Sequence, residues 1–190
     1  MALPLAFLLA LVVLSCKNTC SLCCDLYNLL RLQQINSSAE CQKLLEQSNG
    51  RPADCLSDGM DFKIPKEIKH PQQFQKEHAA FVIYEMLKDI FHVLERGCTN
   101  PGWNETVVKD LRAILNHQMD LLNTTVVGKL GEEHKTWAYS SPILRLKSYY
   151  VRIRTYLEAK EYSSCAWRVV RDELYWNFFF INRLTDKFQN

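Results

Sequence analysis

Apolar residues recur every three or four positions along five stretches of the chain, which is the spacing of one face of an α-helix. The stretches cover residues 26–45, 74–94, 104–126, 143–157 and 165–188. No stretch shows a convincing alternation of apolar and polar residues, the pattern of a half-buried strand. Prolines and glycines lie between the stretches, for example at Pro52, Pro101 and Pro142. The pattern therefore predicts an all-α protein of five helices.

The first connection between these helices is long, about 26 residues. A structureless segment of that length is unusual in a compact domain, so we expect it to be packed or functional. Long overhand connections occur in helical bundles that contain parallel neighbouring helices. We therefore expect a five-helix bundle with up-up-down-down topology.

The last stretch holds more aromatic residues than one face of a helix can bury, in the segment LYWNFFFINRL at 174–184. At about 100° per residue, the face centred on Leu174 gathers Trp167, Val170, Phe178, Ile181, Thr185 and Phe188. Trp176 and Phe179 fall on the opposite side, and Tyr175 falls at the edge. Either the long first connection covers these outer rings, or some of them form an exposed apolar patch that binds a partner.

Length and charge narrow the class of protein. The 190 residues suffice for one domain with a sizeable core. With 23 basic and 21 acidic residues, the chain lacks the basic excess typical of nucleic-acid binding. The fourth stretch carries four cations, Arg145, Lys147, Arg152 and Arg154. They form either a solvated polar face or a basic contact stripe for an acidic receptor or a polysaccharide.

The beginning of the chain has the pattern of a secretory leader. Residues 3–14 are apolar apart from one proline. This run is too short to span a bilayer of about 30 Å as a helix, but it suits the central region of a signal peptide. We expect a signal peptide at residues 1–23, cleavage before Cys24, a mature domain at residues 24–190, secretion, and no insertion into a membrane.

Five cysteines remain after that cleavage, Cys24, Cys41, Cys55, Cys98 and Cys165. An oxidising compartment favours disulfides over metal sites, and an odd number leaves at least one cysteine spare. Cys165 lies in the first turn of the last predicted helix, which Ser163 or Ser164 can cap. A bridge from Cys55 to Cys165 would pin the long connection to this helix, but the sequence leaves the other pairings open.

Catalytic and metal-binding motifs are absent from the sequence. The five histidines form no H-E-x-x-H motif and no i, i+4 pair. The carboxylates at 54–61 do not have the spacing of a calcium loop. The sequence also contains no phosphate loop and no G-x-S-x-G. We expect no enzyme activity, no cofactor and no metal; a secreted helical enzyme is the least favoured alternative.

Three N-glycosylation sequons begin at Asn36, Asn104 and Asn123. Each tripeptide is common by chance, but together with a leader they support secretion. They also predict that these three positions face solvent, although Asn36 falls within the first predicted helix.

Six longer segments carry a resemblance to a known family. They are YNLLRLQQ, CQKLLEQ, FQKEHAAFVIYEML, GWNET, YLEAKEYSSCAW and FINRLT. The segments resemble the beta branch of the type I interferons, whereas the leader through Leu26 is more similar to the alpha branch. The motif CAW followed by VVR is specific to this family, and the resemblance covers nearly the whole chain.

The resemblance implies a helical cytokine that bridges the two chains of the type I interferon receptor and starts an antiviral programme through receptor-associated Janus kinases. The low-affinity chain would meet the second, third and fourth helices, where Lys147 matches a basic contact position. The alternative is a related secreted helical cytokine that acts on a different receptor. We expect a monomer, with a covalent dimer through a spare cysteine as the alternative.

The resemblance also implies a disulfide between Cys55 and Cys165. The second bridge of the alpha branch would join Cys24 to a cysteine late in the third helix, where this chain has Thr125. Cys24 therefore lacks its partner, and Cys98 is a further spare cysteine.

The high-affinity receptor chain of the family contacts the first connection and the last helix. Leu56 and Arg171 match contact positions there. The family commonly has arginine where this chain has Gly59 and Trp176. Losing a buried charged anchor would cost about 2–4 kcal/mol of binding. Trp176 and Tyr175 would recover part of this binding energy by burying apolar area against the receptor chain.

Overall fold

Helices form every regular element in the part of the chain that the structure describes. The computed structural model describes residues 5–47, 55, 59–95 and 103–189, with the backbone alone for residues 5–25, 133 and 134. The long helices are α1 (Leu5–Gln47), α3 (Lys76–Glu95), α4 (Glu105–Thr125), α6 (Ser141–Ala159) and α7 (Ser164–Thr185). The short elements are α2 (Lys66–Lys69), α5 (Glu133–Ala138), η2 (Pro71–Gln73), η4 (Val127–Lys129) and η5 (Asp186–Gln189). The expectation of an all-α fold is confirmed.

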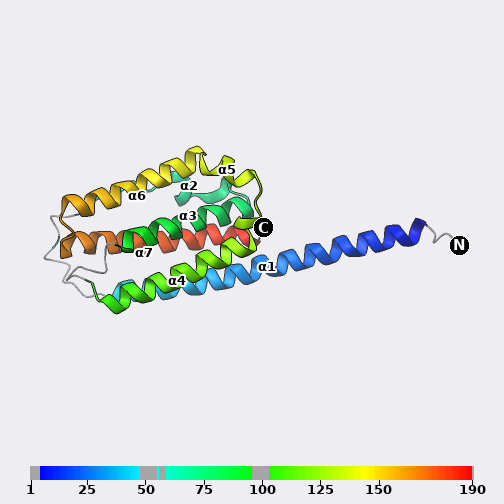
Figure 1. Ribbon diagram of the computed structural model, residues 1–190, viewed down its shortest axis with the longest axis horizontal. Coiled ribbons are helices and arrows are strands. Elements are labelled where there is room, and N and C mark those ends of the chain that lie inside the picture. The colour runs from blue at the N-terminus through cyan, green and yellow to red at the C-terminus, as the bar shows by residue number, and fades with distance from the viewer. Residues whose placement is uncertain (1–4, 48–54, 56–58, 96–102, 190) are drawn as a thin grey trace.

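The directions of the helices follow from their contacts. Gln42 lies beside Tyr175 and Arg31 lies beside Asp186, so α1 and α7 run antiparallel. Figure 1 shows the chain running one way along α1, α3 and α6 and the opposite way along α4 and α7. The helices α1, α3, α4 and α7 therefore have the expected up-up-down-down topology, and α6 lies within the second long connection.

α3 is the central helix of the bundle. Its burial exceeds the single apolar stripe that periodicity predicts, because five successive residues, 79–83, are all buried. A helix that is apolar all round is one that neighbours cover on several sides. Here α4, α6 and α7 all pack on α3, so its position in the bundle explains the difference.

α1 begins at Leu5, well before the expected start near residue 26, and its N-terminal half projects beyond the bundle (Figure 1). The part that packs is the expected helix, although its core face contains polar residues. Gln34 and Ser38 are both buried, and among the described residues Gln34 Oε1 and Ser38 Oγ have no hydrogen-bond partner. An unpaired buried polar group costs about 1–3 kcal/mol, so apolar packing must stabilise this face elsewhere.

The long first connection is packed where the structure describes it, as expected. A buried residue recurs at every third position, at Phe62, Pro65, Ile68, Pro71 and Phe74. The Arg152 side chain of α6 donates hydrogen bonds to two main-chain carbonyls of this segment, those of residues 62 and 63, at 2.9 and 3.1 Å. One side chain of α6 thus fixes the path of the connection.

Side-chain caps set the starts of two helices, and a proline marks the start of a third. The Asn104 side chain accepts a hydrogen bond from Thr106 N at 2.9 Å and begins α4, and Ser163 accepts one from Ala166 N at 3.3 Å and begins α7. The proline after Ser141 lies in the first turn of α6, where its missing N–H costs nothing. All three starts agree with the sequence-based expectation within two residues.

α5 is a helix that the sequence pattern did not predict, because six residues are too few to show a helical period. It is held by Trp137, whose ring stacks on His78 of α3 with centroids 4.7 Å apart. Phe74 meets the same imidazole edge-on at 4.7 Å. His78 Nε2 has no hydrogen-bond partner among the described residues, and burial lowers the pKa of His78 below its usual value of 6.5.

A search of the described helices for a segment both long enough and apolar enough to cross a membrane finds none.

Burial of His78 predicts a pH-dependent stability. As the pH falls below about 6.5, the unfolded chain takes up a proton that the folded imidazole resists, so this group's contribution to stability is lost. His78→Phe keeps an aromatic ring and removes the proton site. We expect the melting temperature of wild type relative to His78→Phe to fall progressively between pH 7 and pH 5.

The measurement is a series of thermal melts across that pH range. The matched control is His117→Gln, which removes an imidazole from an exposed position. A constant difference between wild type and His78→Phe across the range would contradict the assignment.

Candidate functional site

Four aromatic side chains form a continuous patch on the outer side of α7. We call Tyr175, Trp176, Phe179 and Phe180 the aromatic surface. Successive rings meet edge to face, with centroids 6.2, 5.6 and 5.6 Å apart. Trp176 is 53% exposed and Phe179 is 42% exposed. Rings in this number at the surface of one helix mark a binding surface more often than a solvated face.

The two sides of α7 divide as the helical wheel predicts. The residues Trp167, Val170, Leu174, Phe178, Ile181, Thr185 and Phe188 are all buried. The described part of the first connection leaves Trp176 and Phe179 exposed, so the interpretation that the connection covers every outer ring is wrong for these two.

The neighbours of the aromatic surface hold it in place. Gln42 of α1 donates a hydrogen bond to the main-chain carbonyl of Tyr175 at 3.3 Å. At the start of α7, Cys165 is joined to Cys55 by a disulfide with Cα atoms 5.2 Å apart, which is the pair that the family resemblance implies. The bond attaches the start of the long connection to the helix that carries the aromatic surface.

The structure brings three of the expected high-affinity contacts together. Arg171 lies one helical turn before Tyr175, and Trp176 lies beside that ring. Burial lowers the pKa of Arg171, as does Arg168 nearby, but an arginine remains charged because its usual pKa lies far above neutral. Leu56 falls outside the described residues, and Gly59 is exposed.

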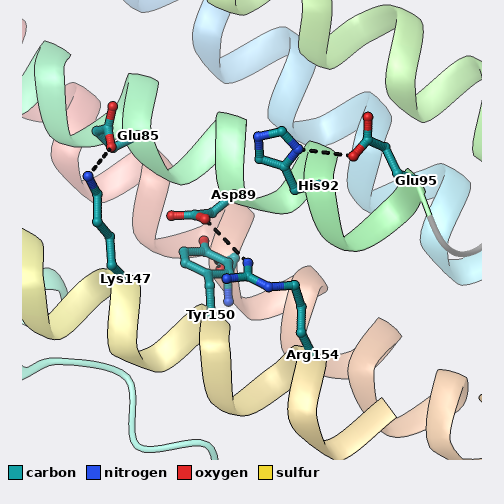
Figure 2. Close-up of polar contacts among 8 residues, drawn as sticks. Glu85, Asp89, His92, Glu95, Lys147, Tyr150 and Arg154 are labelled. Carbon is teal, nitrogen blue, oxygen red and sulfur yellow. Dashed lines mark hydrogen bonds and ion pairs between the residues drawn. The ribbon is translucent and has the colours of Figure 1, made fainter. Parts of the chain in front are cut away.

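Lys147 lies on α6 and is not a free cation. Its Nζ pairs with Glu85 Oε2 of α3 at 3.3 Å, and one turn along α3 Asp89 pairs with Arg154 at 3.4 Å. Figure 2 shows both cations reaching from α6 to the carboxylates of α3, with Tyr150 between them. Burial raises the pKa of Asp89, and Arg154 opposes that shift.

The remaining cations of the fourth predicted helix are also in use. Arg145 bonds Glu67 of the connection, and Arg152 bonds the connection's carbonyls. The face is therefore solvated as well as paired, because the Arg145 and Lys147 side chains remain 49% and 46% exposed. These cations join α6 to its neighbours because α3 and the connection present carboxylates and carbonyls to them.

All three sequon asparagines, Asn36, Asn104 and Asn123, are exposed, as expected. Thr125, the residue in place of the alpha-branch cysteine, bonds the Leu121 carbonyl one turn earlier. Cys41 is the free cysteine whose side chain the structure describes; it is buried, and burial raises its pKa to about 12.

Within the described ranges, no three His, Cys, Asp or Glu side chains gather to hold a metal ion. Sequence reasoning missed Glu85, because an acidic residue inside an apolar run is not a contact signal until the cation that faces it is known.

Comparison with known proteins supports the family resemblance seen in the sequence. A sequence profile described as the interferon alpha/beta domain matches residues 30–188. Interferon beta of Macaca fascicularis is 51% identical over 183 residues, which cover 96% of this chain and 97% of the relative. Interferon beta of Homo sapiens is 50% identical with the same coverage. Interferon alpha-14 of Homo sapiens is 37% identical over 174 residues, 92% of this chain and 90% of the relative.

The disulfide predicts a large loss of stability on its removal. Its cysteines are 110 positions apart, so the bond restricts most of the unfolded chain. Replacing Cys55 and Cys165 together by serine should lower the free energy of unfolding by about 2–5 kcal/mol.

Chemical denaturation followed by circular dichroism measures this loss. Cys41→Ala is the control, since it removes a cysteine without touching the bond. A double variant that unfolds at the wild-type denaturant concentration would show that the bond contributes little.

Proposed function

Because the chain belongs to the type I interferon family, we propose that it bridges the two receptor chains and that its aromatic surface binds the high-affinity chain. The protein is a secreted antiviral cytokine and not an enzyme, and its partner is the type I interferon receptor. The single observation that supports the proposed site is the exposure of Trp176 and Phe179 on α7, the helix that the disulfide joins to the first connection.

Affinity at this surface rests on apolar area in place of charge. The family commonly has arginine where this chain has Gly59 and Trp176. Trp176, packed edge-on between Tyr175 and Phe179, offers a rigid ring with little rotamer freedom to lose. Aromatic anchors of this kind are frequent hot spots. Arg171 and Leu56 complete the proposed contact.

The low-affinity chain is proposed to bind at α6, where Lys147 lies. Lys147 is 46% exposed there although its ammonium pairs with Glu85. The helix also exposes two apolar side chains, Leu144 and Val151, on either side of it. Binding on two faces would bring the receptor chains together and activate their Janus kinases.

Processing and assembly complete the proposal. Residues 1–23 are proposed to be a signal peptide, and the domain at 24–190 is proposed to act as a monomer. Burial of Cys41 argues against a covalent dimer through this thiol, while the side chains of the other spare cysteines, Cys24 and Cys98, fall outside the described part of the chain. Asn104 and Asn123 are proposed N-glycan acceptors; the Asn104 cap uses Oδ1, which leaves Nδ2 for a sugar.

Trp176→Ala tests the proposed high-affinity site. We expect it to weaken binding to the soluble ectodomain by about 10- to 100-fold while the melting temperature changes little, because more than half of the side chain is already exposed. Surface plasmon resonance and a thermal melt give the two quantities. Tyr139→Ala, which removes a ring that is 78% exposed outside the aromatic surface, is the matched control.

A large fall in melting temperature with native-like affinity after refolding would defeat the proposed role of Trp176. Equal losses of affinity for Trp176→Ala and Tyr139→Ala would do the same.

Lys147→Gln tests the second site, and it needs a paired variant. Alone, it leaves Glu85 without its cation, so stability should fall by about 1–3 kcal/mol. The double variant Glu85→Gln/Lys147→Gln removes both charges and should recover that stability. If Lys147 also contacts the low-affinity chain, the double variant should have a lower potency than wild type in an interferon-responsive reporter assay with matched-species cells, even though its stability is restored.

Wild-type potency of the stable double variant would show that Lys147 serves the fold alone. A receptor-blocking antibody establishes that the reporter signal passes through the receptor.

A further inference from the structure

The hydroxyl of Ser38 is unfavourable at its buried position. Ser38 is 1% exposed on the core face of α1. No group among the described residues hydrogen-bonds its Oγ. A methyl group would fill the same site without burying an unpaired hydroxyl. The hydroxyl therefore needs a reason other than stability of the folded bundle.

The sequence around Ser38 supplies a chemical reason. Ser38 is the third residue of the sequon Asn36-Ser37-Ser38, and an acceptor sequon requires a hydroxyl there. Glycan transfer takes place on the chain before it folds, so the later burial of Ser38 and the helical state of Asn36 are no obstacle. Asn36 itself faces solvent in the folded protein.

We propose that Asn36 carries an N-linked glycan, that the Ser38 hydroxyl serves its transfer, and that the glycan flanks the aromatic surface of α7. In the transfer, the sugar's C1–O bond to a lipid-linked pyrophosphate breaks and a C1–Nδ2 bond to Asn36 forms. The lipid pyrophosphate leaves, and the amide gives up one proton to the transferase.

The register between α1 and α7 gives the position of this glycan. Arg31 lies beside Asp186 at 3.4 Å and Gln42 beside Tyr175 at 3.3 Å. Asn36 is five residues from the first contact and six from the second, which places it level with residue 181 of the antiparallel α7. Phe179 and Phe180 are then within about 3 Å of that level along the helix axis.

The other sequons are placed differently. Asn104 and Asn123 lie at the two ends of α4, which packs chiefly on α1 and α3. A glycan at Asn36 stands on the helix next to the aromatic surface. Because a branched sugar sweeps a large volume, we expect it to slow the approach of a receptor chain. This last step rests on the proposed function of the aromatic surface.

Occupancy is tested on the full chain secreted from mammalian cells. Peptide mass spectrometry after enzymatic deglycosylation should find Asn36 modified in wild type, Ser37→Ala and Ser38→Thr, and unmodified in Ser38→Ala. Asn36→Gln should migrate on a gel with one glycan fewer. An unmodified Asn36 in secreted wild type would overturn the proposal.

The role of Ser38 is tested without the glycan. Asn36→Gln and Asn36→Gln/Ser38→Ala both lack the sugar. The difference between their melting temperatures therefore reports only the replacement of the Ser38 hydroxyl by hydrogen. We expect the double variant to melt at the same temperature or higher. A lower melting temperature would show that the hydroxyl stabilises the fold and would overturn its assignment to transfer.

The effect on binding is measured as the association rate with the high-affinity ectodomain. Asn36→Gln should associate about two- to fivefold faster than Ser37→Ala, with a similar dissociation rate. Equal association rates would overturn the flanking position. Trp176→Ala in the Asn36→Gln background separates the two ideas: if that ring proves irrelevant to binding, the proposed function fails while occupancy at Asn36 still stands.

Discussion

The rotation of α7 about its own axis depends on one buried amide, Asn177. Its side chain is fully buried, accepts a hydrogen bond from Tyr150 and donates one to Tyr149 Oη at 2.6 Å. Tyr149 in turn donates to Glu173 at 2.6 Å, and burial raises the pKa of both tyrosines. Turning the helix by one residue would leave these groups unpaired in the core, which the low dielectric there makes costly.

The outer side of α7 follows from that rotation. With Leu174 and Phe178 directed into the core, Trp176 and Phe179 lie on the outer side of the helix and remain exposed. The disulfide at Cys165 and the contact of Gln42 with the α7 backbone hold the helix from two sides. A binding surface built on a fixed helix loses little conformational freedom when a partner arrives, which favours affinity. The fold and the proposed receptor site therefore depend on the same interactions.

The cations of α6 lie at the surface, but they also hold neighbouring elements together. The cations of α6 neutralise Glu85, Asp89 and Glu67 and bond the carbonyls of the first connection. They join helices that run side by side but lie far apart in the sequence. A receptor chain that meets α6 must therefore share Lys147 with Glu85, whereas one that meets α7 finds mainly rings.

The sequence by itself determined the five long helices, the starts of α4, α6 and α7 and the outward position of Trp176 and Phe179, because periodicity and capping act within a few residues of one segment. The family resemblance added the disulfide pair. Only the tertiary structure decided that α3 is covered on several sides, that α5 stacks on His78, that Lys147 pairs with Glu85 and that Ser38 is buried without a partner. Each of these depends on which helix lies against which. Contacts between residues far apart in the chain set that arrangement, and no local pattern records them.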